Sequence, residues 1–421
     1  MPSNLVPPPP STEPPDSAGG PAAAAPPAPQ GSALEVLLAF FKLGLTSFGG
    51  PVAHLAYFRT EFVERRRWLS DPDYSDLVAL CQFLPGPASS QVGAALGLLR
   101  AGWRGALAAW AGFTLPSAVL LVLFALGVTQ WAVQGASGAL HGLKVAAVAV
   151  VAQAVLGMAR SLCPDRLRAG LAVAAALLVL GLPGTWGQLA AIALGGFVGW
   201  HMLQLGPLAP AQHRRYGVSR RAGAALLAVF ALLLVALLLW ASVADSMVAS
   251  AMAVFYQAGA LVFGGGHVVL PLLQAGVVPP GWVGNDAFLA GYGAAQAVPG
   301  PLFTYAAYLG AVMPHPLGGW GGAALMLGAI FAPALLLVAG ALPFWEVLRQ
   351  RPAVQRAVGG VNAAVVGILG AALYDPVWTS AVHSRTDFAL ALAAFGLLVH
   401  ARWSPVWVVG LAAMAGWWLG R

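Results

Sequence analysis

A glycine-rich phrase that occurs twice constrains the fold of this chain more than any other feature. Residues 40–51 read FFKLGLTSFGGP, and residues 255–266 read FYQAGALVFGGG, so that Phe48 of the first copy corresponds to Phe263 of the second. Further along, each copy is followed by a proline-glycine-proline turn, QFLPGP at 82–87 and QAVPGP at 296–301. Each phrase interrupts an apolar run, which predicts a helix, a break and a second helix.

The composition places these breaks in a membrane. Only 8% of the residues are charged and 59% are hydrophobic, whereas soluble domains carry about 25% charged residues. Apolar runs near the roughly 20 residues that cross a bilayer recur along the chain. The sequence therefore predicts an all-α polytopic membrane protein. Its net charge of +7 is scattered between the apolar runs, which is typical of loops that orient a membrane protein, so no nucleic-acid partner is expected.

The chain divides into a tail, two repeats and a connector. Residues 1–32 are rich in Pro and Ala and nearly free of charge, so we expect a disordered tail. The first repeat spans 33–204 and the second 249–421, with a basic linker and one connecting membrane helix in 205–248. Helices are predicted over 34–48, 51–64, 73–84, 87–99, 103–128, 137–160, 168–183 and 187–204, then 222–242, then 249–263, 266–276, 285–298, 301–313, 318–343, 354–374, 386–401 and 404–420.

The basic loops predict how the repeats are oriented. In the first repeat, loops 59–67 and 100–104 are basic, whereas in the second repeat loops 277–284 and 314–317 contain no Lys or Arg and loop 345–356 is basic. Positive loops stay in the cytoplasm. We therefore expect inverted-topology repeats with a cytoplasmic N-terminus. The short paired helices fit either re-entrant hairpins or thin full crossings, and both alternatives stay open here.

The breaks predict a site for a small anion. Transporters with inverted repeats and broken helices hold their substrate near the midplane, where the repeats meet. Pro51, Pro87 and Pro301 fit the first turn of the helix that follows, and free N–H groups at helix starts favour an anion. Side chains near the breaks offer donors and no carboxylate, which a cation would need. The candidate substrate-binding residues are Gly49, Gly50, Pro51, His54, Gln82, Pro85, Gly86, Pro87, Ser89, Ser90, Gln91, Lys144, Gly264, Gly265, Gly266, His267, Gln296, Pro299, Gly300, Pro301, Thr304 and Tyr305.

These interpretations have structural alternatives. Gly and Pro also serve close packing and kinks in membrane helices, and a histidine near a break fits a satisfied structural residue as well as a ligand contact. Lys144 and Lys42 are expected to be buried in spans, where charges are costly and usually functional, although a lysine also snorkels to the interface. Arg59 and Glu61 fit either a gate at the inner mouth or a solvated face.

No catalytic, metal-binding or nucleotide-binding motif occurs in the sequence. The missing patterns include a Ser-His-Asp set and a phosphate-binding loop. We therefore expect neither an enzyme, nor a cofactor, nor a bound metal, and a secondary carrier is favoured over a nucleotide-driven pump.

Several phrases together resemble the chromate ion transporter (CHR) family, in its long, two-domain form. The resemblance covers about residues 34–420. It implies efflux of chromate across the bacterial inner membrane, with sulfate as the related oxyanion, and it implies that the phrases form the sites. We expect a secondary carrier of this kind to be driven by the membrane potential, a proton gradient or both, because a potential that is negative inside favours the exit of a dianion. A carrier of sulfate or another small anion and an anion channel are the alternative functions. The protein could also form a homodimer, which the sequence leaves open. The phrases are Phe48-Gly49-Gly50-Pro51-Val52-Ala53-His54, Arg66-Arg67-Trp68-Leu69, Phe83-Leu84-Pro85-Gly86-Pro87, Phe263-Gly264-Gly265-Gly266-His267-Val268-Val269-Leu270-Pro271 and Val298-Pro299-Gly300-Pro301.

Overall fold

The computed structural model describes most of the chain outside its N-terminal tail. The described residues are 31–131, 137–182, 184–204 and 217–418. The predicted disordered tail lies outside them up to residue 30, as does the part of the predicted linker at 205–216. Ser32, at the end of the predicted tail, caps the first helix, because its Oγ accepts a hydrogen bond from the Glu35 N–H at 3.0 Å.

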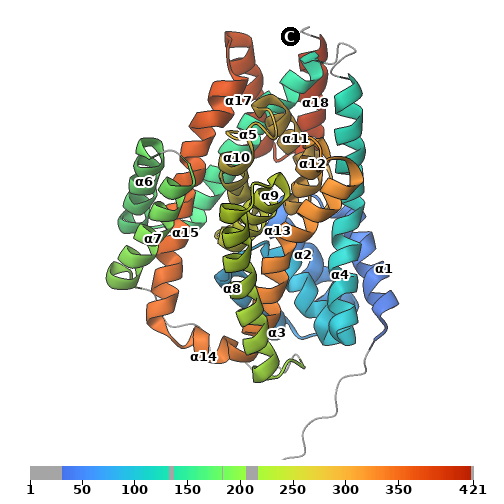
Figure 1. Ribbon diagram of the computed structural model, residues 1–421, viewed down its shortest axis with the longest axis vertical. Coiled ribbons are helices and arrows are strands. Elements are labelled where there is room, and N and C mark those ends of the chain that lie inside the picture. Colours follow the sequence, from blue (N-terminus) through green and yellow to red (C-terminus); the bar gives the residue numbers. More distant parts are fainter. Residues whose placement is uncertain (1–30, 132–136, 183, 205–216, 419–421) are drawn as a thin grey trace, which may run out of the picture. The chain divides into compact units, whose positions relative to one another are not determined.

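Each predicted span is a helix in the structure (Figure 1). Five helical stretches of the described residues are long and apolar enough to cross a membrane, so the chain is an all-helical, multi-pass membrane protein. The first repeat contains α1 (Ala33–Thr46), α2 (Gly50–Arg59), α3 (Asp71–Phe83), α4 (Ala88–Trp131), α5 (Ser137–Leu162), α6 (Arg166–Gly181) and α7 (Thr185–Met202). The connector is α8 (Arg220–Val243). The second repeat contains α9 (Met247–Leu261), α10 (Val269–Val277), α11 (Asn285–Ala297), α12 (Tyr305–Val312), α13 (Gly319–Ala341), α14 (Trp345–Arg349), α15 (Pro352–Ala372), α16 (Thr379–Ala381), α17 (Arg385–Val399) and α18 (Pro405–Trp418).

Helix α4 combines two predicted helices, 87–99 and 103–128, across a sharp bend. The bend lies at Ala101 and Gly102, and Gly102 has a φ of +62°, which glycine adopts without steric cost. A Cβ on Gly97 would lie 2.2 Å from the carbonyl oxygen of Gly105. Eight residues of a straight helix span about 12 Å, so the two arms of α4 fold back on each other.

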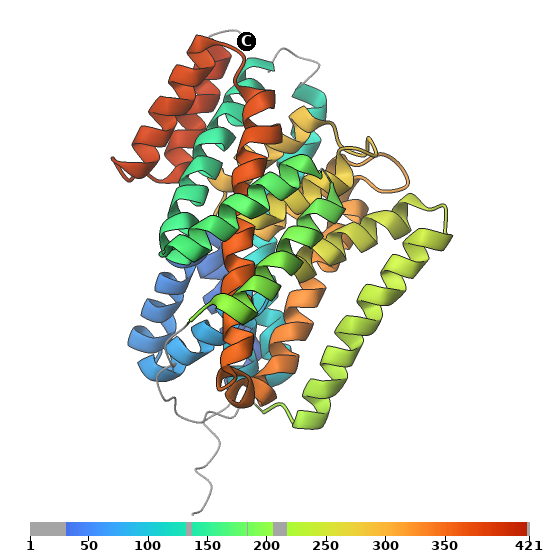
Figure 2. The same ribbon diagram turned by 90° about the vertical axis from the view of Figure 1, so that its left-hand side faces the viewer.

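The last helices of each repeat pack against a long helix of the other repeat. Helices α6 and α7 pack on α15, and α17 and α18 pack on α5, as both views show (Figures 1 and 2). Glycines permit this close approach: a Cβ on Gly142 of α5 would lie 2.1 Å from the carbonyl oxygen of Ala412, and one on Gly199 of α7 2.5 Å from that of Arg356. The helices of the two repeats are therefore interleaved.

Candidate functional site

Each proline-glycine-proline break forms a backbone hydrogen bond to the glycine-rich break of the other repeat. The N–H of Gly86 donates to the carbonyl of Val262 at 2.6 Å, and the N–H of Gly300 donates to the carbonyl of Ser47 at 2.9 Å. Ser47 and Val262 hold equivalent positions, directly before the Phe-Gly-Gly sequence of each repeat. The same bond is therefore made twice, and we call these two places the Gly86 crossing and the Gly300 crossing.

The crossings explain why glycine stands at the centre of both turns. Gly86 has a φ of +119° and Gly300 a φ of +99°, a region that side chains with a Cβ rarely adopt. A Cβ on Gly86 would lie 2.9 Å from Cβ of Ala334, and one on Gly300 would lie 2.8 Å from Oγ of Ser117. Ala334 and Ser117 each directly follow the proline inside α13 and α4. Both breaks are therefore packed against protein.

A small cavity lies beside the Gly300 crossing. Its volume is about 60 Å³, compared with the roughly 10–15 Å³ that one water requires, so a small ion fits. The structure brings six of the predicted site residues to its wall: Gly49, Gly50, Pro51, His267, Gln296 and Gly300. These residues come from breaks and flanking helices of both repeats.

Sequence reasoning missed the other half of the cavity wall. Gln153 was the one missed residue with a signal, because it is a lone amide inside the apolar span 137–160. Its Nε2 makes a long contact of 3.5 Å with the carbonyl of Leu398. The others are aliphatic or small side chains that carry no functional pattern. The missed wall residues are Val150, Gln153, Ala295, Val298, Leu302 and Pro405.

Two side chains of the cavity wall, His267 and Gln296, each have a nitrogen without a well-formed hydrogen bond among the described residues. Nδ1 of His267 lies 2.7 Å from the Tyr292 hydroxyl, and Nε2 has no partner among the described residues. Nε2 of Gln296 is buried and makes no hydrogen bond of good geometry in the described part of the chain, although the amide lies close to the Tyr292 hydroxyl. An unpaired buried donor costs free energy, which a bound acceptor would recover. Within the described residues, no Asp or Glu lines the cavity, so the site suits an anion.

A second, larger hollow does not suit an anion. It measures about 180 Å³, lies between α4, α8 and α13, and is lined by aliphatic side chains and Trp103. An anion would lose its hydration there without gaining hydrogen bonds. The described residues also contain no cluster of three or more His, Cys, Asp or Glu side chains that could hold a metal ion.

The Gly86 crossing holds other predicted residues but is filled by side chains. A Cβ on Gly264 would lie 3.1 Å from Cδ1 of Leu162 and 3.3 Å from Cε of Met158, both from α5. Nε2 of Gln91 donates to the carbonyl of Pro85 at 2.8 Å, while its buried Oε1 has no partner among the described residues. None of the predicted residues in these segments lines the cavity, and they are Pro85, Gly86, Pro87, Ser89, Ser90, Gln91, Gly264 and Gly265.

Several predicted residues near the Gly300 crossing support its backbone. Thr304 Oγ1 donates to the carbonyl of Pro301 at 2.7 Å, and the Tyr305 hydroxyl donates to the carbonyl of Phe288 at 2.6 Å. Pro299 is buried. A Cβ on Gly266 would lie 3.7 Å from both Pro51 and Leu302 of the cavity wall. These residues therefore shape the cavity from behind its surface.

In the structure, four further polar or charged residues that the sequence analysis singled out lie away from the cavity wall. His54 is 1% exposed, and neither ring nitrogen makes a hydrogen bond of good geometry in the described residues, although the ring lies close to the Ser47 backbone. Gln82 is exposed on α3. Lys144 is buried as predicted, but its Nζ lies 2.8 Å from Asp286 Oδ1 in an ion pair. The expectation that Lys42 is buried is wrong, because its side chain is exposed on α1.

The placement of two prolines was wrong by one residue. Pro51 occupies the first turn of α2 as predicted. However, α4 begins at Ala88, after Pro87, and Pro301 caps a short 3₁₀ turn, Leu302–Thr304, from an extended conformation with a ψ of 134°. Pro87 still meets the helix, because its carbonyl accepts a hydrogen bond from the Gln91 N–H at 3.0 Å. The carbonyls of Pro87 and Pro301 thus accept the first hydrogen bond of the helical turn that follows, while the two proline residues themselves precede that turn.

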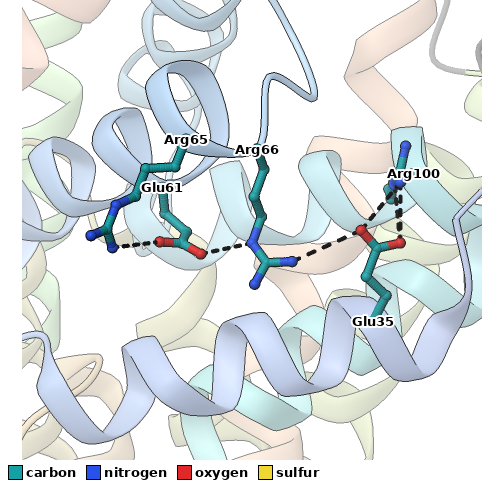
Figure 3. Close-up of polar contacts among 5 residues, drawn as sticks. All are labelled: Glu35, Glu61, Arg65, Arg66 and Arg100. Carbon is teal, nitrogen blue, oxygen red and sulfur yellow. Dashed lines mark hydrogen bonds and ion pairs between the residues drawn. The ribbon is translucent and has the colours of Figure 1, made fainter.

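A network of ion pairs joins α1, the π-helical turn Thr60–Arg65 and the bend of α4 (Figure 3). Nε of Arg66 lies 2.7 Å from Glu61, and its Nη1 lies 3.9 Å from Glu35, which in turn lies 3.1 Å from Nη2 of Arg100. Both guanidinium groups also lie over the Trp68 ring. Glu61 is therefore part of a partly buried network.

Arg59, the other candidate for the gate, belongs to a solvated face. It contacts Glu64 and Asp71 at 2.6 Å each, and all three side chains are about half exposed, with 47%, 49% and 50% of their surface accessible. Exposed pairs of this kind contribute little to stability. The structure therefore separates two residues that the sequence could not distinguish.

We expect Glu61→Gln to lower stability by about 1.5–3 kcal/mol, because hydrogen bonds to charged groups contribute that much. Burial alone raises the pKa of Glu61, but the hydrogen bond and charge of Arg66 outweigh it, so the pKa lies below its usual value. This stabilisation is thus present above the ordinary carboxyl pKa and is lost as the pH falls through the lowered pKa. Thermal unfolding in detergent measures both effects. Glu64→Gln, at an exposed ion pair, is the control, and equal shifts for the two variants would contradict the prediction.

Comparison with known proteins identifies related sequences. The chain matches the family described as "Chromate transporter" over residues 34–200 and 249–417. A chromate transport protein of Pseudomonas aeruginosa is 30% identical over 413 residues, which cover 92% of this chain and 93% of the relative. One of Cupriavidus metallidurans is 28% identical over 400 residues, which cover 92% and 94% respectively. No solved structure matches the chain.

Proposed function

Because the chain belongs to the chromate transporter family, we propose that it is a secondary carrier that binds chromate in the cavity and exports it from the cytoplasm. The observation that supports this most is the composition of the cavity wall. Breaks from both repeats line it, and it offers unpaired donors and, among its described residues, no carboxylate. A tetrahedral oxyanion presents the acceptors that these donors lack.

In this proposal the wall residues divide the work of binding. Gln296 Nε2 and the free ring nitrogen of His267 donate hydrogen bonds to the oxyanion, and charge-assisted hydrogen bonds of this type are the stronger ones. Helix α2 begins at Gly50 without a side-chain cap, so its first N–H groups add a partial positive charge. The N–H of Gly300 is already bonded to Ser47, and Gly300 therefore holds the two breaks together.

We propose that the repeats have inverted topology and work by alternating access. The distribution of basic loops supports this, as do the two equivalent crossings and the exchange of packing partners between α5 and α15. The network around Glu61 lies at the end that carries the basic loops 59–67 and 100–104. Its ion pairs then close the cytoplasmic entrance when the cavity faces outward.

The membrane potential is a sufficient energy source for export. A potential of about 100 mV, negative inside, favours outward movement of a dianion by roughly 4.6 kcal/mol, twice the figure for one charge. Two accompanying protons would cancel this electrical drive. The proposal is therefore export of the dianion with fewer than two protons.

Counterflow in proteoliposomes that contain only this protein tests the function. Vesicles loaded with chromate should transiently accumulate labelled chromate from outside, because a carrier exchanges its substrate across the membrane. Net transport of chromate should accelerate when the compartment that chromate leaves is made electrically negative. An anion channel would instead give single-channel currents without counterflow. Transport that ignores both potential and pH gradients would contradict the energy source.

Sulfate is the second candidate substrate. The wall donors recognise the oxygens of a tetrahedral oxyanion and make no contact specific to its central atom. Competition between the two ions distinguishes the candidate substrates. Excess sulfate should inhibit chromate counterflow only partly if chromate is the preferred substrate. Expression in a chromate-sensitive host should then raise chromate resistance, and complete loss of that resistance in high sulfate would favour sulfate.

A further inference from the structure

Among the described residues of the cavity wall, His267 alone has a side chain that can bind a proton and become positively charged. The other wall residues are glycines, prolines, small or aliphatic side chains and two glutamines. A proton that enters the wall of the cavity therefore has one place to bind.

The groups that face His267 are all uncharged. Tyr292 and Gln296 approach from α11, and they are neighbours on that helix because they are four residues apart. Gln153 comes from α5, Leu302 from the 3₁₀ turn, and Asn362 of α15 lies near the adjacent Gly264. Within the described residues that line the cavity, no fixed charge lies beside the imidazole, so the charge of a bound dianion would be the nearest one that stabilises the protonated ring.

The hydrogen bond to Tyr292 limits what a neutral ring can offer. A neutral imidazole donates from one nitrogen only, whereas the protonated ring donates from both. In the protonated ring, Nδ1–H donates to the Tyr292 oxygen, 2.7 Å away, and Nε2–H donates to the oxyanion. A dianion in the cavity also favours the charged ring. Anion binding and proton uptake therefore assist each other.

We propose that His267 is a proton-binding site that carries one proton with each oxyanion. This rests on the proposed function of the cavity. The proton binds at Nε2 or Nδ1 when the dianion enters and leaves when the dianion leaves. Each transport cycle then moves one net negative charge, and half of the electrical drive on the dianion is retained.

Reversal potentials count the protons directly. Proteoliposomes are set with a tenfold chromate gradient at mildly alkaline pH, where chromate in solution is a dianion. One proton per anion predicts that about 59 mV balances the gradient, and a chromate dianion alone predicts about 30 mV. Two protons make the cycle electroneutral, so that no potential balances it. In the wild type we expect about 59 mV, and a pH difference of one unit should shift the balance by the same amount.

His267→Gln separates proton binding from anion binding, because the amide still donates a hydrogen bond but does not titrate. The variant should transport more slowly and balance near 30 mV per tenfold gradient, with no response to pH. Tyr292→Phe keeps the imidazole and should retain about 59 mV, which leaves a second test if His267→Gln fails to fold. His54→Gln alters a histidine outside the cavity wall and should also retain one proton per anion.

The outcomes separate this inference from the function on which it rests. Wild-type protein without chromate counterflow would refute the proposed function. Wild-type counterflow that balances near 30 mV, or a His267→Gln variant that still balances near 59 mV, would refute the proton site alone. A loss of coupling in His54→Gln with none in His267→Gln would also overturn it.

Discussion

Gly300→Ala should lower the rate of chromate transport by at least about fivefold. The residue has a φ of +99°, and its Cβ would lie 2.8 Å from Ser117 Oγ and 3.2 Å from the carbonyl oxygen of Phe113. Strain of this kind costs about 1–3 kcal/mol, which corresponds to roughly 5–150-fold in rate if the transporting state bears it. Initial rates of uptake into proteoliposomes measure the effect.

Two further glycines make this experiment specific. Gly86→Ala should slow transport as well, because the Gly86 crossing is equivalent, but it should leave the apparent affinity for chromate unchanged since Gly86 lies outside the cavity wall. Gly328→Ala is the control, because a Cβ there meets nothing within 4 Å. Wild-type rates in a well-folded Gly300→Ala variant would show that the crossing is dispensable.

Gln296→Leu should raise the KM for chromate by at least about tenfold, with a smaller effect on the maximal rate. The substitution keeps the approximate size of the side chain but removes the unpaired buried Nε2 from the cavity wall. A hydrogen bond to a charged group contributes about 1.5–3 kcal/mol, or roughly 10–150-fold in affinity. Concentration dependence of uptake separates KM from the rate.

The repeat provides a comparison for this second prediction. Gln82 holds the equivalent position before the other proline-glycine-proline turn, yet its side chain is exposed on α3. Gln82→Leu should therefore leave KM unchanged. Equal changes in both variants would mean that the substrate does not bind at the Gly300 crossing.

The helices and breaks could be predicted from the sequence because glycine, proline and long apolar runs act locally. The breaks at Gly49–Gly50 and Gly264–Gly265 have positive φ values that few other residues adopt, and each predicted span is a helix. The sharp bend of α4 at Ala101–Gly102 could also be predicted, because a short basic loop separates two apolar runs there. These features do not depend on distant parts of the chain.

The contents of the site depend on tertiary packing and could be predicted only in part. The sequence treats the two crossings alike, but Met158 and Leu162 of α5 fill the space at one of them. Gln153 reaches the cavity only because α5 packs among helices of the second repeat. Lys144 of α5 likewise pairs with Asp286 of α11 only because these two helices pack together. No local pattern encodes these long-range neighbours.

Anomalous diffraction from chromium, in crystals grown with chromate, tests the central claim most directly. The account predicts a chromium peak in the small cavity beside Gly50 and Gly300, with oxyanion oxygens in hydrogen-bonding distance of Gln296 and His267. A chromium site elsewhere in the protein, with this cavity empty or open to lipid, would contradict it.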